Sequence, residues 1–217
     1  MKIQFIKYTV IAGLCLTVIF NGCKKEETTT DNPPVTDTTP AFVFLKVGNN
    51  YKYNLKGINT PPDTGYTTID TAMVMKVESE NAGLFKIKIT TKVGPYTSLD
   101  SMYVKKDKDG LWEKDSATAT TFHQVIKSSP AVGDEFKHYT LKGGVKDTSF
   151  SKILAIGQSV TVGAGTFMCA KMKEWEGAAN KDKNYDFTFI DLNVGLIKIE
   201  SYENGIMVNE ISLKSKN

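Results

Sequence analysis

The sequence predicts an all-β fold: an antiparallel meander of about ten strands that forms a curved sheet, a sandwich or a partly closed barrel. Three observations lead to this prediction. Apolar and polar residues alternate with a period of two over most of residues 42–217, as they do in strands with one buried face. Glycine, proline and asparagine interrupt the alternation at short intervals, which is typical of turns. No long segment repeats its apolar residues at the spacing of an amphipathic helix.

The first 22 residues have the order of an export signal. Two lysines give a basic start, an apolar run follows over residues 8–20, and Gly22 precedes Cys23. The apolar run is shorter than the roughly 20 residues that a membrane-spanning helix needs. We therefore expect residues 1–22 to be a signal peptide and the mature chain to begin at Cys23.

Residues 23–41 predict a disordered tether. Threonine, proline and acidic residues dominate, and no apolar position recurs, so folding this segment would bury too little surface to offset the entropy cost of ordering it. Residues 42–217 are long enough for a single β domain with its own core. We expect the tether to hold that domain away from a membrane surface.

Within the domain, alternation and turn residues predict the strands in order. One hairpin turns at residues 81–83, a second at Asp109-Gly110 and a third at Asn204-Gly205. Such short turns of glycine with asparagine or aspartate favour the positive φ angles of tight hairpins. Apolar residues spaced for one strand face flank the first and third turns: Met73, Met75, Val77, Phe85, Ile87 and Ile89, then Ile197, Ile199, Met207, Ile211 and Leu213.

Residues 45–125 and 130–214 are similar enough to predict two repeats of one unit. Val132-Gly133 follows Val47-Gly48 by 85 residues, and Gly195-Leu196 follows Gly110-Leu111 by the same 85. Each unit would open with a Val-Gly turn and an aromatic strand and close with a hairpin. Chance similarity between two β-rich segments is the alternative explanation.

Two N-terminal motifs are similar to those of bacterial lipoproteins. Residues 20–23, Phe-Asn-Gly-Cys, resemble the site at which such proteins are cleaved and acylated, and residues 24–27, Lys-Lys-Glu-Glu, resemble the charged export tag of surface lipoproteins from Bacteroidota-type bacteria. The resemblance implies lipidation of Cys23, for example with palmitate, and attachment to the outer membrane. It leaves open whether the domain is exposed on the cell surface. A conventional signal peptide that leaves Cys23 as a free thiol is the alternative.

Three motifs within the domain are similar to a set that recurs in Bacteroidota-type outer-membrane lipoproteins of unknown function. They are Val47-Gly48-x-x-Tyr51, Ala164-Gly165-Thr166-Phe167-x-Cys169 and Val194-Gly195-Leu196-Ile197-Lys198. The resemblance covers nearly the whole domain and implies its architecture and its location in the envelope. It implies no activity.

The type of basic residue indicates which partners the protein binds. All 27 basic residues are lysine, whereas arginine is favoured where phosphate is bound through two parallel hydrogen bonds. We therefore expect no nucleic-acid partner, although genomic base composition would explain the bias equally well.

After removal of the signal peptide, Cys169 is the only cysteine besides Cys23, so the domain can form no internal disulfide. The apolar neighbours of Cys169 predict that its thiol is buried.

No arrangement of residues predicts catalysis or a metal site, and we expect neither an enzyme nor a cofactor. His123 and His138 have no cysteine or acidic residue at ligand spacing, so we expect them to be exposed or fully hydrogen-bonded. Residues 107–110, Asp-Lys-Asp-Gly, lack the further acidic ligands of a calcium loop and predict a hairpin tip. Glu174 and Glu176 share one strand face; they would form a catalytic pair only inside a cleft, and we expect an exposed polar face.

Two binding hypotheses remain, beside a purely structural role, for a non-enzymatic envelope or cell-surface protein. The first hypothesis is a surface for a glycan or protein partner, built from the aromatic residues Tyr103, Trp112, Trp175 and Tyr202. It requires that at least two of them are exposed on a concave face. Alternatively, these residues cap the core. The alternative function is a carrier of a hydrophobic ligand in a cavity lined by methionine. Its lining residues would be Met73, Met75, Met102, Met168, Met172 and Met207, which would otherwise fill the core.

Overall fold

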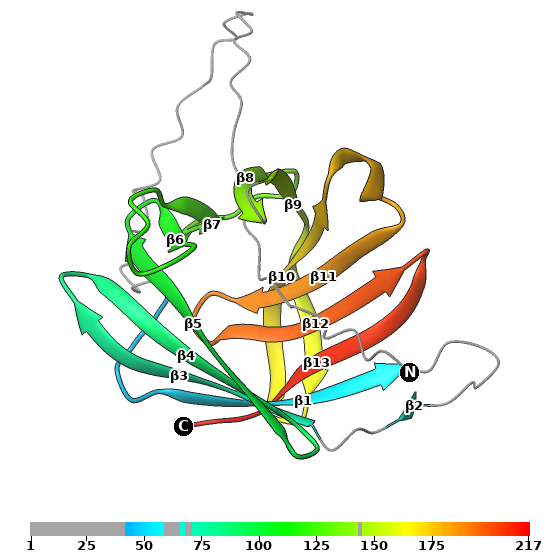
Figure 1. Ribbon diagram of the computed structural model, residues 1–217, viewed down its shortest axis with the longest axis horizontal. Coiled ribbons are helices and arrows are strands. Elements are labelled where there is room, and N and C mark those ends of the chain that lie inside the picture. Colours follow the sequence, from blue (N-terminus) through cyan, green and yellow to red (C-terminus); the bar gives the residue numbers. More distant parts are fainter. Residues whose placement is uncertain (1–41, 59–65, 68–70, 143–144) are drawn as a thin grey trace, which may run out of the picture.

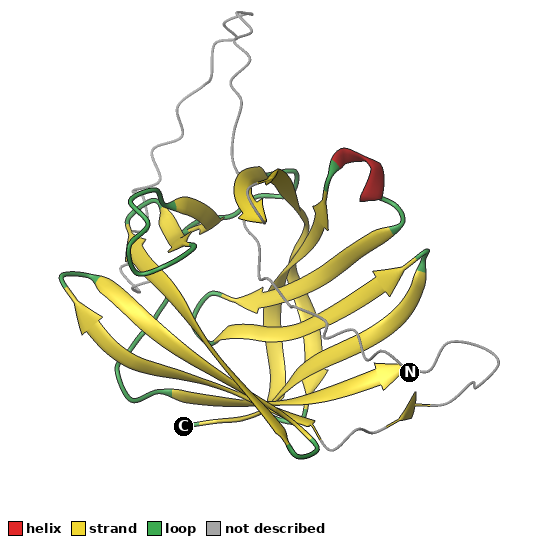
Figure 2. Cartoon of the chain, in the orientation of Figure 1, coloured by secondary structure: helices red, strands yellow, loops and turns green. Residues whose placement is uncertain are grey.

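The computed structural model describes residues 42–58, 66–67, 71–142 and 145–217 (Figure 1). The predicted signal peptide, Cys23 and the predicted tether lie outside these residues. The described part contains thirteen strands, all paired antiparallel, and one short 3-10 helix, which confirms the predicted all-β class (Figure 2). No helix in this part is long and apolar enough to cross a membrane.

The strands follow one another along the chain with short connections. They are β1 (Asn50–Ile58), β2 (Tyr66–Thr67), β3 (Thr71–Asn81), β4 (Leu84–Val93), β5 (Tyr96–Asp107), β6 (Gly110–Lys114), β7 (His123–Lys127), β8 (Glu135–Lys142), β9 (Val145–Val162), β10 (Gly165–Glu176), β11 (Asn184–Asp191), β12 (Gly195–Glu203) and β13 (Ile206–Lys216). The helical turn η1 (Ala178–Asn180) lies between β10 and β11.

One sheet contains all of these strands and curves into a nearly closed barrel (Figure 1). Neighbouring strands follow the order β7-β6-β5-β4-β3-β1-β13-β12-β11-β10-β9-β8, and β2 pairs with β1 beside this path. The sheet is therefore the predicted meander, joined between its two halves by the pairing of β1 with β13. β7 and β8 are its two edges, and no ladder of backbone hydrogen bonds joins them in the described residues. We call the gap between them the seam.

The two Val-Gly turns of the predicted repeats have the same geometry. Gly48 and Gly133 have φ angles of 96° and 93°, and each donates its backbone N–H over 2.9 Å, Gly48 to the carbonyl oxygen of Val77 and Gly133 to that of Ile153. Six strands follow each turn if the two-residue β2 is left aside. In this comparison β1 corresponds to β8 and β7 to β13, so the seam lies where a pairing equivalent to β1–β13 would form. The division into two repeated units stays a prediction.

The segment before β1 closes one end of the barrel. Phe42 and Leu45 in this segment are only 1% and 4% exposed. The Phe42 N–H donates to the Leu192 carbonyl oxygen over 2.8 Å, and Lys106 Nζ donates to the Phe42 carbonyl oxygen over 3.1 Å. The segment thus reaches from β5 across to the turn after β11. We call this the plugged end, and we call the other, where β4 meets β5 and β10 meets β11, the open end.

The core lies next to the plugged end and is apolar. Because side chains alternate between the faces of a strand, every second residue of the central strands points into the barrel. The buried residues include Tyr53, Val77, Val104, Ile126, Ile153, Met172, Ile197 and Leu213.

Candidate functional site

Four aromatic residues form a continuous row on the outer face of β9–β12 near the open end. The strand register pairs Phe150 with Trp175, Trp175 with Tyr185, and Tyr185 with Tyr202. Met172 on β10 is buried in the core, so Trp175, three residues further along the same strand, points outward. We call these four residues the outer aromatic row.

The rings of the outer aromatic row stack on one another in pairs. Phe150 and Trp175 have ring centres 5.4 Å apart and nearly parallel planes, and so do Tyr185 and Tyr202 at 5.0 Å. Phe187 meets both tyrosines edge to face, at 5.3 and 5.4 Å. Each such pair contributes about 0.5–1.5 kcal/mol beyond the burial of its surface. All four rings of the row are half-buried, so part of each remains available to a partner.

Lysine side chains from the same face cover the outer aromatic row. Their ammonium groups lie within cation–π distance of ring centres: Lys137 at 5.4 Å from Phe150, Lys181 at 5.7 Å from Trp175, Lys173 at 4.1 Å from Tyr185, and Lys171 at 3.9 Å from Phe187. Lys173 also pairs with Asp182. The other three lysines form no ion pair with a described carboxylate, so this face combines apolar surface with positive charge.

The structure divides the four predicted binding residues into two pairs. Trp175 and Tyr202 belong to the outer aromatic row. Tyr103 and Trp112 lie on β5 and β6, in the other half of the sheet. All four are half-buried, so none is wholly in the core and none stands free in solvent. Their separation means that the four do not form one continuous surface.

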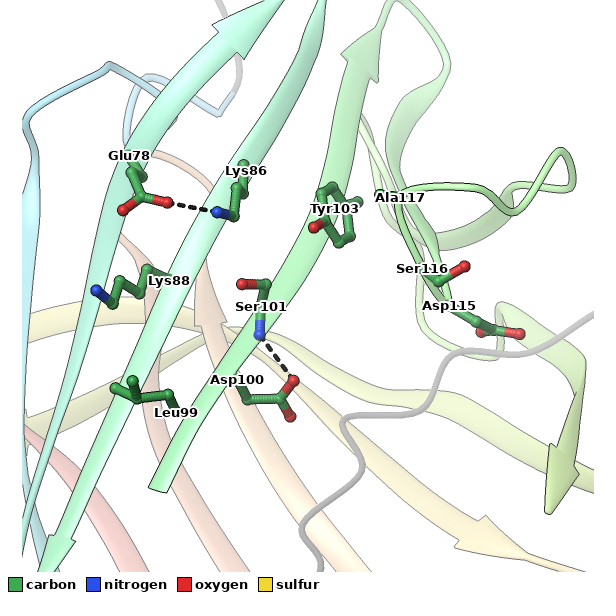
Figure 3. A pocket seen from close by; sticks show the side chains of 10 residues that line it. All are labelled: Glu78, Lys86, Lys88, Leu99, Asp100, Ser101, Tyr103, Asp115, Ser116 and Ala117. Atoms are coloured by element: carbon green, nitrogen blue, oxygen red, sulfur yellow. Dashed lines mark hydrogen bonds and ion pairs between the residues drawn. The ribbon is translucent and has the colours of Figure 1, made fainter. Parts of the chain in front are cut away.

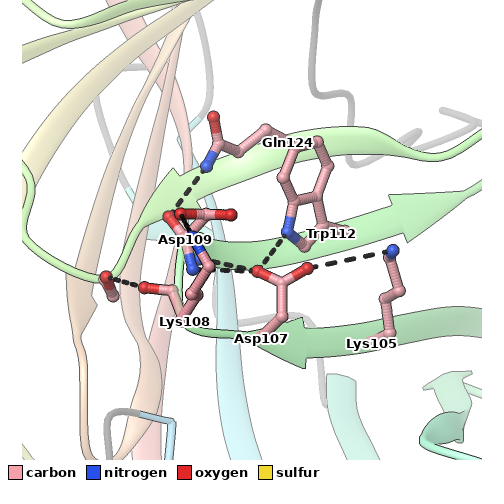
Figure 4. A network of polar contacts seen from close by, with 8 residues as sticks. Lys105, Asp107, Lys108, Asp109, Trp112 and Gln124 are labelled. Atoms are coloured by element: carbon pink, nitrogen blue, oxygen red, sulfur yellow. Dashed lines mark hydrogen bonds and ion pairs between the residues drawn. The ribbon is translucent and has the colours of Figure 1, made fainter.

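Trp112 is held by the hairpin that joins β5 and β6 (Figure 4). Its Nε1 donates to Asp107 Oδ1 over 2.9 Å, and the same oxygen accepts the backbone N–H groups of Asp109 and Gly110. These hydrogen bonds, that from Trp112 first, lower the pKa of Asp107. Residues 107–110 therefore form the predicted hairpin tip. No group of three histidine, cysteine, aspartate or glutamate side chains in the described part could hold a metal ion.

On the inner face of the same strands, near the open end, the core becomes polar. Ser151, Glu174, Asp186, Ser201 and Asn209 are register partners in sequence across β9–β13, and we call them the inner polar row. Glu174 was expected on an exposed face. Instead it is half-buried inside the barrel, where Thr188 Oγ1 donates a hydrogen bond to it. The expectation was wrong because alternation places Glu174 on the same face as Met172, which is buried.

Three ionisable side chains meet at the seam. The rings of His123 on β7 and His138 on β8 stack across it, with centres 4.3 Å apart and planes 13° from parallel. Glu113 on β6 places its Oε2 4.0 Å from His123 Nε2. All three are buried, with exposed fractions of 9% or less. We call Glu113, His123 and His138 the seam cluster.

Several polar atoms in and around the seam cluster are buried without a partner. They are Glu113 Oε2, His123 Nε2, His138 Nδ1, Ser149 Oγ and Ser151 Oγ. Ser149 is the register partner of His138. The expectation that both histidines are exposed or fully hydrogen-bonded was wrong. A buried polar atom without a hydrogen bond costs about 1–3 kcal/mol, so these atoms lower the stability of the fold at the seam.

Burial dominates the electrostatics of the interior. Desolvation raises the pKa of Glu113 well above its usual range, and the nearby carboxyl groups of Asp115, Glu174 and Asp100 raise it further. Desolvation also raises the pKa of Glu174 to about 8, against the hydrogen bond from Thr188. It lowers the pKa of His138 to about 2, with a smaller effect from His123. These shifts favour the uncharged forms of Glu113, Glu174 and His138.

A shallow groove of about 490 Å³ lies on β3–β5 and the segment after β6 (Figure 3). Its lining includes Tyr103, Leu99, Asp100 and Asp115. Asp100 and Asp115 are two of the carboxyl groups that act on Glu113. Most of its lining residues, such as Glu78, Lys86 and Tyr103, lie on the outer face of the sheet, because their strand neighbours Val77, Ile87 and Val104 are buried inside the barrel.

The methionines do not surround this groove. Met75 and Met172 are buried in the core, Met73 and Met102 pack against it, and Met168 is 62% exposed. The groove has no methionine in its lining. Met73, Met75, Met102 and Met172 therefore fill or flank the core, the second of the two roles expected for them, whereas Met168 is exposed and Met207 is half-buried on β13. Cys169, the free cysteine of the described part, is also buried, and desolvation raises its pKa to about 12.

The seam cluster was missed by sequence reasoning, although alternation carried a signal for it. Leu111, Val125 and Phe136 are buried apolar residues. Each lies two positions from one member of the cluster on the same strand, and residues two apart share a strand face. What the sequence did not show is that β7 and β8 face each other.

Comparison with known proteins identifies the fold of this chain but no activity. No protein-family model and no curated protein matches this sequence. A solved structure of a Bacteroides fragilis protein assigned as exported, with a YmcC-like fold, matches with a TM-score of 0.57 and 16% identity over 82% of this chain and 100% of that one. A solved structure of a Parabacteroides distasonis protein assigned as a lipoprotein matches with a TM-score of 0.49 and 13% identity over 82% of this chain and 99% of that one. The first similarity shows a shared fold, the YmcC-like barrel.

Proposed function

We propose that this chain is a lipid-anchored protein of the bacterial outer membrane, exposed at the cell surface, whose β domain binds an acidic glycan without catalysing a reaction. The order of residues 1–22, the position of Cys23 and the lysine- and glutamate-rich residues after it support the anchor and the location. The fold shared with an exported protein of Bacteroides fragilis agrees with them. Each CH₂ of an acyl chain on Cys23 would contribute about 0.8 kcal/mol of membrane affinity.

The outer aromatic row is the observation that carries the binding role. Its four rings span three strand spacings, about 14 Å, which suits an extended chain better than a single small molecule. Partly exposed aromatic rings offer apolar contact to the C–H groups of sugars, and Lys137, Lys171 and Lys181 offer positive charge that no carboxylate of the described residues pairs with. A carboxylate-bearing polysaccharide would draw these lysines away from the rings and so uncover them. Stabilisation of the sheet by cross-strand aromatic pairs explains the rings but not the lysines that lie over them.

Affinity electrophoresis in gels that contain polygalacturonate, or neutral dextran for comparison, tests this role. We expect the acidic polymer to retard the mature protein. Trp175→Ala should weaken binding about five- to thirtyfold, because it removes a central ring of the row. Trp112→Ala is the matched control, since Trp112 is a half-buried tryptophan in the other half of the barrel. Equal losses in both variants, or equal retardation by dextran, would contradict the proposal; retardation by neither polymer would point to a protein partner.

The anchor has a separate test. Cys23→Ser should release the protein from the membrane fraction into the soluble envelope fraction while leaving its polysaccharide binding unchanged. Mass spectrometry of the membrane-bound protein should find the acyl chains on an N-terminal Cys23. A mature N-terminus at another residue would contradict the lipid anchor.

A further inference from the structure

The hairpin of β9 and β10 folds across the plugged end of the barrel. β13 lies three strands away from β10 in the sheet, yet the Ala164 N–H at the hairpin tip donates to the Leu213 carbonyl oxygen of β13 over 3.2 Å. Near the tip, the register partners Val160 and Phe167 pack against the core. The tip therefore reaches across the ends of β11 and β12, and the outer face of the hairpin forms part of the outside of the plugged end.

Large apolar side chains are exposed on this outside. Because Phe167 faces the core, its neighbour Met168 faces outward. A Cβ atom on Gly157 would lie 3.9 Å from Met168 Cε, so Met168 lies over the backbone of β9 beside Ile156. The exposed apolar residues on the hairpin and on the two Val-Gly turns at this end are Val43, Val47, Val132, Leu154, Ile156 and Met168. Exposed apolar side chains gathered in one region of a surface mark an interaction site.

The elements around this end carry only positive charge. Residues 42–53, 154–171 and 211–217 contain five lysines and no aspartate or glutamate. Four of the lysines are exposed, namely Lys46, Lys52, Lys214 and Lys216. These four form no ion pair with a carboxylate of the described residues. Of the carboxylates in adjoining turns, Asp107 and Asp191 accept backbone N–H groups of their own turns. A surface that is both apolar and basic fits an anionic lipid surface.

The proposed anchor brings a lipid surface to this end. The predicted tether, residues 23–41, joins the domain at Phe42, which lies in the plugged end. A flexible chain of 19 residues, the length of this tether, has a root-mean-square length of about 24 Å. A lipid on Cys23 would thus present the membrane to the plugged end at an effective concentration of about millimolar. The tether is a poor cover for the exposed apolar side chains, because no apolar position recurs in it.

We propose that the plugged end docks on the anionic lipid surface of the membrane that holds the anchor. Ile156 and Met168 enter the headgroup region, and the exposed lysines contact lipid phosphates. This inference rests on the proposed lipid anchor. The outer aromatic row lies near the open end, so docking would direct it away from the membrane, towards a polysaccharide in the medium.

Fluorescent labels at the two ends of the barrel test the docking. The mature protein with Cys23→Ser receives a polarity-sensitive label at Met168→Cys or, as the matched control, at Leu99→Cys, since Met168 and Leu99 are 62% and 65% exposed at opposite ends. Cys169 is buried and does not compete for the label. The probes are vesicles of phosphatidylcholine with about one third phosphatidylglycerol and a small amount of a doxyl lipid as quencher. At millimolar lipid we expect quenching of the label at residue 168 and none at residue 99.

Two lysine variants test the part played by charge. Lys214→Gln should weaken binding to these vesicles about fivefold, because each lysine near an anionic lipid surface contributes about that factor. Lys92→Gln is the control, since Lys92 is an exposed lysine on β4 next to the open end, and it should leave binding unchanged. Equal effects of the two variants would contradict the docking.

The labels also separate docking from its alternatives. Equal quenching at both positions, or quenching at neither, would overturn the proposal. A change at residue 168 that needs no vesicles and grows with protein concentration would identify a second copy of the chain as the partner instead. Because the Cys23→Ser protein has no acyl chain, failure of docking in this experiment is distinct from failure of the anchor, which mass spectrometry of Cys23 tests.

Discussion

Glu174 is a carboxyl group inside the barrel, and its environment determines how stability depends on pH. Desolvation raises its pKa from the ordinary 4.5 to about 8. The folded protein therefore keeps this proton to a higher pH than the unfolded chain does. The resulting stabilisation is fully present below pH 4.5 and is lost as the pH rises through 8.

Glu174→Gln should remove this pH dependence. The amide has the shape of the protonated carboxyl group and can still accept the hydrogen bond from Thr188. At pH 9 we expect the variant to have a free energy of unfolding about 1–2 kcal/mol above that of the parent, and at pH 4.5 the two should agree, as measured by urea denaturation. Glu203→Gln, at an exposed position on β12, should show no such difference. An unchanged alkaline slope would mean that Glu174 is solvated.

The protonation of His138 makes stability depend on pH in the opposite direction. Its pKa is lowered to about 2, so below pH 6.5 the unfolded chain takes up a proton that the folded protein refuses. Stability is therefore lost as the pH falls below 6.5. Together, Glu174 and His138 confine the greatest stability to the weakly acidic and neutral range.

At the scale of single elements, Gly110 shows how tightly the β6–β7 pair is packed. A Cβ atom at this position would lie 2.2 Å from the carbonyl oxygen of Ile126 on β7. Gly110 is also the register partner of Lys127. No side chain can be accommodated there without separating the two strands.

We expect Gly110→Ala to lower the free energy of unfolding by about 3 kcal/mol, because it breaks the pairing of an edge strand. Gly205→Ala is the control: Gly205 also has a positive φ, 78°, but nothing lies within 4 Å of its added Cβ. Gly205→Ala should lower the free energy of unfolding by about 1 kcal/mol, because only the strain of the left-handed backbone opposes it. Chemical denaturation of both variants gives the comparison, and equal losses would show that strand contact at Gly110 is unimportant.

The same elements show which features local sequence can predict. The turns at residues 81–83, 109–110 and 204–205 were predicted and are present between β3 and β4, β5 and β6, and β12 and β13, because their dipeptides determine backbone angles locally. The outer aromatic row was not predicted beyond Trp175 and Tyr202. Its assembly depends on the registers of β9–β12, which shift at bulges such as that between Cys169 and Lys171, and a one-residue shift exchanges the two faces of a strand.

At the scale of the whole molecule, the barrel has two unlike ends. The plugged end is apolar and closed by Phe42 and Leu45. At the open end the inner polar row and the seam cluster face inward while the outer aromatic row faces outward. Alternation along a strand predicts that its faces differ, but it does not say which face is inside. That choice depends on closure of the whole sheet, for which no local pattern gives a signal.

The seam should be the least protected part of the sheet. β1 and β13 exchange backbone hydrogen bonds along seven register pairs, whereas the equivalent edges β7 and β8 are joined by side chains: the stack of His123 on His138 and the ion pair of Lys127 with Asp134 at 2.6 Å. We therefore expect the seam-facing amides of β7 and β8 to exchange with deuterium at least a hundredfold faster than those between β1 and β13, since only the latter must wait for strand separation. Hydrogen exchange read by NMR measures both sets in one sample, and the amides between β12 and β13 serve as an internal reference. Equal protection at the seam and at β1–β13 would show that β7 and β8 pair in solution and that the barrel is closed.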